Sequence, residues 1–176
     1  MGTCRTGAPA NDLPAGAIRI DFTSPSQTIS GNSAGSTNQS GCGAAGDVYY
    51  RFTVPTGARQ IVYVDTFGSG YDTELAFAPA SGVGTIAGTC TDDTCGVLQT
   101  QIARVLDPGD YYLVVSGFGS TMLGPFTLHF QHLPVGSGAV TQITTLTAGL
   151  QTFMGTTAGT GVITESCTAA PGPETT

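Results

Sequence analysis

Residues 47–54 read DVYYRFTV, and every second position carries an apolar or aromatic side chain. These side chains are Val48, Tyr50, Phe52 and Val54. Side chains two apart lie on the same face of an extended chain, so this pattern predicts a half-buried β-strand. The turn signal PTG follows at 55–57, and an extended pattern resumes over 59–65. We expect these two strands to form a β-hairpin.

Six further segments show extended patterns bounded by turn residues. They are 73–78, 97–106, 111–116 and 126–131, with weaker examples at 17–22 and 27–30. No segment up to residue 132 has helical periodicity, and the chain contains 26 Gly and 10 Pro. Short strands joined by tight turns predict an all-β fold, an antiparallel β-sandwich of jelly-roll type with about eight strands.

The chain after residue 132 has two interpretations. Its motifs GTTAGT and CTAA occur in the same order as GNSAGS and CGAA do after residue 30. This order indicates the incomplete start of a second repeat, and a linker rich in Thr and Gly is the alternative. We therefore divide the chain into a sandwich over residues 1–132 and a linker or incomplete repeat over 133–176.

The charge composition excludes several classes of partner. The 176 residues carry a formal net charge of −7, and all five basic residues are arginines. Nucleic-acid binding needs many basic side chains to neutralise phosphates, and docking on anionic lipid needs them too. No stretch approaches the ~18 consecutive apolar residues that would insert into a bilayer. Small cations are the more natural partners of this surface.

The five cysteines indicate an extracellular protein that contains disulfides. Cys90 and Cys95 enclose the polar turn TDDT, and we favour a local disulfide there over a metal site. Cys4 and Cys42 form the expected second pair. This pairing leaves Cys167 without a partner in the chain, so we expect its partner to lie outside it.

The sequence offers little material for catalysis, and we expect no enzyme. The only histidines are His129 and His132, and the chain has no lysine. Three residues apart in a strand, the two histidines face opposite sides and cannot bind one metal together. We therefore expect no nucleophile paired with a His or Lys base.

Acidic residues give a candidate calcium site. Asp72 and Glu74 lie at the start of an expected strand, and Asp92 and Asp93 lie in the turn enclosed by cysteines. Calcium takes six to eight oxygen ligands, which loops of this kind supply. If the two loops meet at one end of the sandwich, Ca²⁺ binds there. The alternative is that Asp72 caps a turn while Asp92 and Asp93 are solvated.

Tyr71 is the candidate ligand-binding residue, because it adjoins Asp72 in an expected loop. The chain has no tryptophan, so tyrosines are the available aromatic platforms for a sugar ring. Tyr49, Tyr63 and Tyr111 are further candidates. The alternative for each tyrosine is ordinary packing on a sheet.

Four blocks of sequence, taken together, resemble the bacterial pre-peptidase C-terminal domain. They are GDVYYRFTVP at 46–55, YDTELAF at 71–77, LDPGDYYLVV at 106–115 and GPFTL at 124–128. The segment 90–96 is similar to the Cys-Asp-Asp turn of cysteine-bearing members in large secreted proteins. The resemblance covers roughly residues 11–131.

The resemblance implies a β-sandwich without catalytic activity, attached to exported enzymes or adhesins and often present in tandem. Some members bind collagen or polysaccharide, and some hold calcium near the N-terminal linker, which here offers Asn11 and Asp12. We therefore expect a secreted accessory module that binds an extracellular polymer or protein surface. The alternative is a structural repeat unit of an extracellular filament or adhesin stalk, completed by a strand from a neighbouring repeat.

Overall fold

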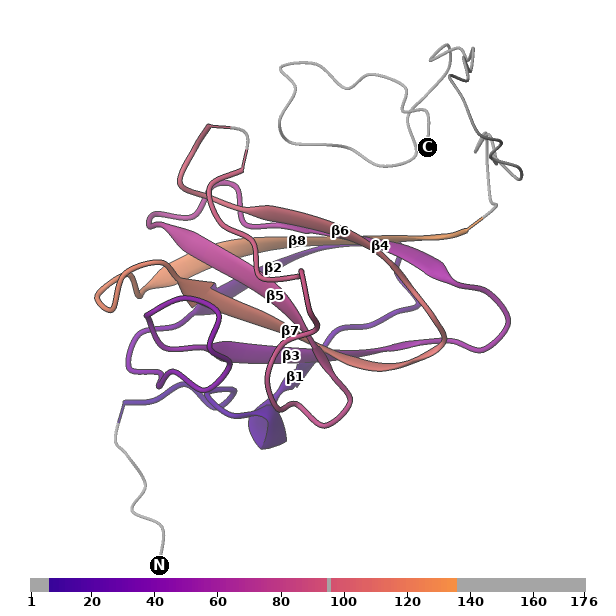
Figure 1. Ribbon diagram of the computed structural model, residues 1–176, viewed down its shortest axis with the longest axis horizontal. Helices are drawn as coiled ribbons and strands as arrows, with labels where there is room; N and C mark the ends of the chain where they lie inside the picture. Colours follow the sequence, from indigo (N-terminus) through magenta and orange to yellow (C-terminus); the bar gives the residue numbers. More distant parts are fainter. Residues whose placement is uncertain (1–6, 95, 136–176) are drawn as a thin grey trace, which may run out of the picture.

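The computed structural model describes residues 7–94 and 96–135, which form two four-stranded sheets packed face to face (Figure 1). The first sheet has the order β1-β3-β7-β5, and the second has the order β2-β8-β4-β6. The strands are β1 (Ile18–Arg19), β2 (Ser26–Asn32), β3 (Val48–Val54), β4 (Gln60–Asp65), β5 (Thr73–Pro79), β6 (Gln101–Leu106), β7 (Gly109–Gly117) and β8 (Pro125–Pro134). A single 3₁₀ turn, η1 (Pro14–Gly16), is the helical element of these residues.

Successive strands alternate between the two sheets, as in a jelly roll. The expected all-β sandwich is confirmed. One pairing departs from the antiparallel pattern, because the two-residue strand β1 runs parallel to β3. No helix in the described part of the chain is both long and apolar enough to cross a lipid bilayer.

The core lies between the sheets and is built from the period-two pattern read in the sequence. The four side chains of β3 that were expected to face inward are at most 2 % exposed. They pack against Leu75 and Phe77 of β5 and against the inward residues of β8. Phe52 contacts Phe130 across the sandwich, with ring centroids 5.2 Å apart in an edge-to-face arrangement.

The expected hairpin of β3 and β4 is wrong. β3 pairs with β7, with Val48 opposite Val115, whereas β4 pairs with β6 and β8 in the other sheet. The turn over 55–59 therefore arches from one sheet to the other. Alternation identifies the face of a strand that is buried, and both strands bury theirs in the same core. It does not identify the strand with which each one pairs.

Loops cover the outer face of the first sheet as well. Tyr49, Ala76 and Val114 form a second buried cluster there, together with Cys42. The chain near Asn11 is tied to β3, because the backbone N–H of Tyr49 donates to the Asn11 carbonyl over 2.8 Å. This cover explains why the first six residues of β5 are buried, although alternate side chains point away from the core.

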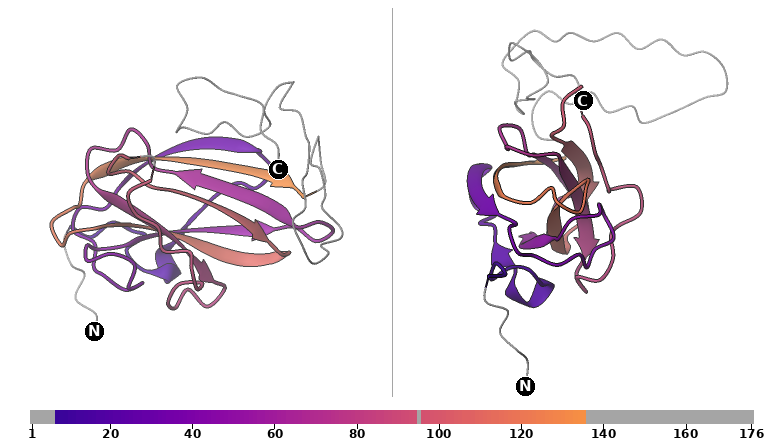
Figure 2. Two further views of the ribbon diagram at one scale, coloured as in Figure 1. Left: turned by 45° about the horizontal axis from the view of Figure 1, so that its top comes forward. Right: turned by 90° about the vertical axis from the view of Figure 1, so that its left-hand side faces the viewer.

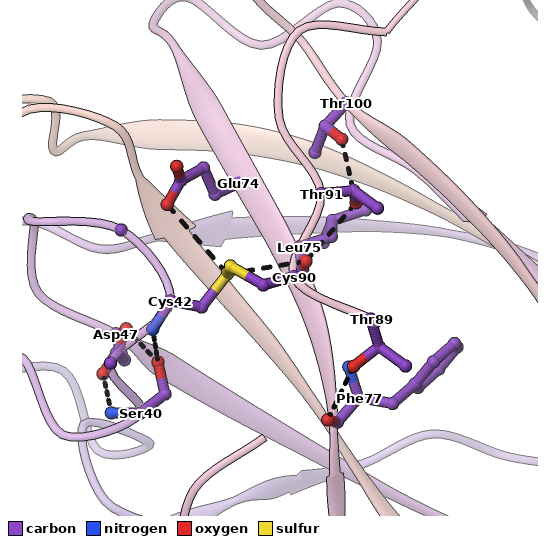
Figure 3. Close-up of a disulfide and its surroundings, with 12 residues drawn as sticks. Ser40, Cys42, Asp47, Glu74, Leu75, Phe77, Thr89, Cys90, Thr91 and Thr100 are labelled. Atoms are coloured by element: carbon purple, nitrogen blue, oxygen red, sulfur yellow. Dashed lines mark hydrogen bonds between the residues drawn. A yellow bond between two sulfur atoms is a disulfide. The ribbon is translucent and has the colours of Figure 1, made fainter. Parts of the chain in front are cut away.

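The expected disulfides are wrong, because Cys42 pairs with Cys90. Cys90 cannot then bind Cys95, nor Cys42 bind Cys4. Thr91 exchanges two backbone hydrogen bonds with Leu75 of β5, which places Cys90 beside the sheet that the Cys42 loop covers (Figure 3). Close spacing favoured a local pair, but the fold brings together cysteines 48 residues apart. Cys4, Cys95 and Cys167 lie outside the described residues.

The disulfide pairing has a direct test, because trypsin cleaves after the five arginines. Digestion of the denatured, unreduced protein is expected to yield a covalent pair of the peptides 20–51 and 60–104, detected by mass spectrometry and lost on reduction. Peptide 60–104 contains both Cys90 and Cys95, so the same pair is expected to persist in the Cys95→Ala variant. A pair of the peptides 1–5 and 20–51 would instead support the Cys4–Cys42 bond and contradict the structure.

Removing the cross-link is expected to destabilise the domain. A disulfide that closes a loop of 48 residues restricts the unfolded chain by an amount worth about 4 kcal/mol on the chain-entropy model. We expect the Cys42→Ala/Cys90→Ala variant to lose up to that free energy of unfolding in urea titrations. Cys95→Ala is the matched control, and an equal loss in that variant would contradict the pairing.

Candidate functional site

Three aspartates that are separate in sequence meet at one end of the sandwich. Asp72 immediately precedes β5, while Asp92 and Asp93 follow Cys90 in the segment bound to that strand. Each contributes one carboxylate oxygen to a group whose members all lie within 4.8 Å of one another. The loop over 118–124 lies at the same end, at the left in Figure 1 and toward the viewer in the right-hand panel of Figure 2. The structure therefore brings together three of the four residues predicted to bind a metal.

Two oxygen atoms of this acidic group are buried without a hydrogen-bond partner. Asp72 is 8 % exposed, and its Oδ1 atom is buried without a hydrogen bond. Oδ1 of Asp92 is buried and unbonded in the same way. Burial raises the pKa of Asp72, and the charges of Asp92 and Asp93 raise it further. Unpaired buried carboxylate oxygens are costly, so a cation in this position would relieve both desolvation and repulsion.

Glu74 lies beside the group but outside it. Its carboxylate is 7 % exposed, with Oε2 4.0 Å from Sγ of Cys42 (Figure 3). Burial raises the pKa of Glu74 to about 7, and the neighbouring charges, that of Asp92 first, add to the effect. Both cysteine sulfurs near Glu74 are consumed in the disulfide, so they offer no thiolate to a metal. The role of Glu74 as a metal ligand stays a prediction.

Two other carboxylates of the domain accept hydrogen bonds from protein donors. Asp47 accepts hydrogen bonds from the backbone N–H groups of Gln39 and Ser40 and from the Ser40 hydroxyl. Asp12, in the linker segment that the family resemblance pointed to, accepts bonds from the backbone and hydroxyl of Thr37. These carboxylates hold loops in place, whereas those of Asp72 and Asp92 each retain an unbonded oxygen.

Tyr71 is partly buried in the loop before β5 and packs against the core. Its hydroxyl lies 2.9 Å from Oγ of Ser33, and burial raises the pKa of the phenol. The structure thus gives Tyr71 a packing role next to the acidic group. Its role as a ligand-binding residue stays a prediction.

Both histidines make structural contacts. His129 on β8 lies 2.6 Å from the carboxylate of Asp65. The ring of His132 stacks on Phe22 with centroids 3.8 Å apart, and burial lowers the pKa of His132. As predicted, the two rings lie on opposite faces of the strand. His132 is two residues from Phe130, which faces the core, whereas His129 lies on the alternate positions that face outward.

Exposed apolar side chains flank the acidic group, and they were not anticipated from the sequence. The backbone N–H of Phe118 donates to the Asp72 carbonyl, and that of Thr73 donates to the Leu98 carbonyl. The side chains of Phe118 and Leu98 are 58 % and 55 % exposed. No local pattern marks them, because their position beside Asp72 results from long-range backbone bonds.

The comparisons with known proteins concern the fold. No family model matches the chain, and no curated protein matches it. Among solved structures, it is similar to the pre-peptidase C-terminal domain of a collagenase from Bacillus anthracis, with 17 % identity and a TM-score of 0.39 over 66 % of this chain and 94 % of that one. It is also similar to a periplasmic inhibitor of g-type lysozyme from Aeromonas hydrophila, with 16 % identity and a TM-score of 0.45 over 66 % of this chain and 96 % of that one.

The raised pKa of Glu74 predicts that the stability of the metal-free protein falls with rising pH. The folded state keeps a proton on Glu74 up to about pH 7, whereas the unfolded chain loses it near its ordinary pKa of 4.5. The folded state therefore binds more protons between these values, and stability falls as pH rises through this window. In EGTA, we expect a lower urea midpoint at pH 8 than at pH 6.5.

The variant Glu74→Gln isolates this effect, because it keeps the side chain neutral at every pH. We expect it to be more stable than the natural protein at pH 8 and to lose most of the decline between pH 6.5 and pH 8. His132 has a lowered pKa, so its contribution to stability rises with pH around its ordinary value of 6.5. That contribution is the same in the natural protein and in Glu74→Gln, so the difference between the two proteins isolates Glu74. A natural protein whose midpoint rises toward pH 8 would contradict the assignment.

Proposed function

We propose that this chain is a calcium-stabilised, non-catalytic binding module of a secreted bacterial protein. The observation that carries the proposal is the convergence of Asp72, Asp92 and Asp93, with two buried oxygens that no protein donor satisfies. The disulfide and the sandwich fold accord with an extracellular location. The contacts of His129 and His132 accord with the absence of catalysis, because they are those of structural residues.

Calcium fits the donor set better than other common ions. All three donors are carboxylates on loops, and calcium prefers oxygen ligands in a flexible arrangement completed by backbone carbonyls and water. Structural zinc sites are built mainly from cysteine and histidine, and the nearby sulfurs are bonded to each other. Bound calcium would supply positive charge where three carboxylates repel one another, and it would join the loop before β5 to the segment after Cys90.

The same end of the module is the proposed binding surface. Phe118 and Leu98 are exposed, and backbone bonds fix them on either side of the Asp72–Thr73 peptide. Exposed aromatic and aliphatic side chains on loops commonly contact a partner, here an extracellular polymer or protein surface. Calcium would hold these side chains in one arrangement and so reduce the entropy that binding would otherwise cost.

Calcium is expected to raise the thermal midpoint of the purified protein. A ligand that binds only the folded state stabilises it by about 2.7 kcal/mol at one hundred times its dissociation constant. For a domain of this size, this corresponds to a rise of several degrees, measured by calorimetry in EGTA and in millimolar CaCl₂.

The variants Asp72→Asn and Asp92→Asn separate metal binding from folding. Each relieves repulsion in the metal-free protein, so we expect its midpoint in EGTA to equal or exceed that of the natural protein, while the calcium increment disappears. Asp107→Asn, in the exposed turn before β7, is the matched control and is expected to keep the full increment. A natural protein without any increment would eliminate calcium from the proposed function.

A further inference from the structure

A cavity of about 300 Å³ opens on the outer face of the first sheet, at the end of β7 opposite the acidic group. Its polar lining comes from three strands and comprises Arg19, Arg51, Thr53, Asp110, Tyr111 and Tyr112. This volume is at the lower end of the range for small-molecule sites. The lining contains two of the five basic residues of a chain whose net charge is −7.

The two arginines lie next to each other on neighbouring strands. Arg19 of β1 is the register partner of Arg51 in the parallel pair β1–β3, so their side chains leave the same face about 4.8 Å apart at the backbone. Both are exposed. Within residues 7–94 and 96–135, neither guanidinium forms a hydrogen bond or an ion pair. The pKa of Asp21 is lowered by hydrogen bonds from Thr23 and, to a smaller extent, by the charge of Arg19. Two adjacent guanidinium groups that form no direct ion pair favour an anion, which they bind through paired hydrogen bonds.

The rest of the lining is suited to hydroxyl groups and a ring. The Asp110 carboxylate accepts a hydrogen bond from the Thr53 hydroxyl over 2.7 Å and keeps further acceptor positions. Tyr112 is held edge-on against Tyr49, with centroids 6.3 Å apart. The loop after β5 approaches it closely, since a Cβ atom added to Gly82 would lie 3.3 Å from the Tyr112 ring. The cavity thus combines a held aromatic ring with both cationic and anionic groups.

We propose that this cavity binds a sugar acid, such as a uronate residue of an extracellular glycan. The carboxylate of the sugar would pair with the guanidinium groups of Arg19 and Arg51. Its hydroxyls would donate to Asp110, and its ring would lie against Tyr112. A ligand with one negative charge and several hydroxyls satisfies both kinds of group in the lining.

Two other classes of anion fit less well. A ligand dense in phosphate or sulfate would meet the negative charge of Asp110 inside the cavity and the net charge of −7 outside it. An acidic peptide would pair with the arginines but would bring few hydroxyl donors to Asp110. The sugar acid is therefore the occupant that the lining favours.

This site is separate from the proposed calcium site. The two share no residue, and β7 separates them, with Asp110 near its start and Gly117 at its end next to the loop that contacts Asp72. Failure of one proposal therefore leaves the other intact.

The test is a titration of the ¹⁵N-labelled protein with digalacturonate, followed by NMR. Digalactose, the neutral counterpart, and the dipeptide Glu-Glu, which has carboxylates without ring hydroxyls, are titrated in parallel. We expect shifts at residues of the cavity with digalacturonate and at least tenfold weaker binding of the other two. Arg51→Gln is expected to weaken digalacturonate binding by about tenfold or more, because a charge-assisted pair is lost.

Arg59→Gln is the matched control, because Arg59 is exposed, precedes β4 in the other sheet and lies outside the cavity lining. This variant removes the same charge and is expected to bind digalacturonate within about twofold of the natural protein. The comparison distinguishes binding at a defined site from non-specific electrostatic attraction. The proposal is overturned if digalacturonate does not bind or if Arg51→Gln binds it unchanged. It is also overturned if Arg59→Gln loses as much, or if either control ligand binds equally well.

Discussion

The Cys42–Cys90 disulfide is the constraint on which the acidic end of this molecule depends. It fastens the loop before β3 to the segment that runs beside β5, and so holds the cover over the outer face of the first sheet. Asp92 and Asp93 follow Cys90 directly, so the same bond keeps two carboxylates close to Asp72 against their mutual repulsion. Without the cross-link, nothing covalent would oppose the separation of these charges.

The covered outer face also explains the behaviour of Glu74. In an ordinary sandwich, an outward-facing glutamate on a strand is solvated and keeps its usual pKa. Here the cover buries the carboxylate beside the disulfide, and burial is the first cause of its raised pKa. An ionisable side chain thus occurs in strand β5, where all but the last residue are buried, because loops cover a face that would otherwise be exposed.

Local periodicity predicted the strands well and their partners poorly. The alternation in 47–54 identified β3 and its buried face, because a period of two is a property of the strand itself. The arch to β4 and the Cys42–Cys90 bond depend on which distant segments meet, and turn residues or cysteine spacing carry no such information. The three aspartates were predicted as ligands from their residue type, but the unbonded oxygens of Asp72 and Asp92 could be recognised only once the loops were in place.

The arginine cavity was missed for a related reason. Arg19 and Arg51 lie 32 positions apart in the sequence. From the sequence alone, each is expected to be an ordinary solvated side chain on a strand. They become neighbours because β1, only two residues long, adds to the edge of β3 in parallel. Had β1 shifted by one residue relative to β3, the Arg19 side chain would leave the other face, toward the core. The positive charge of the cavity therefore depends on the register of the shortest strand in the fold.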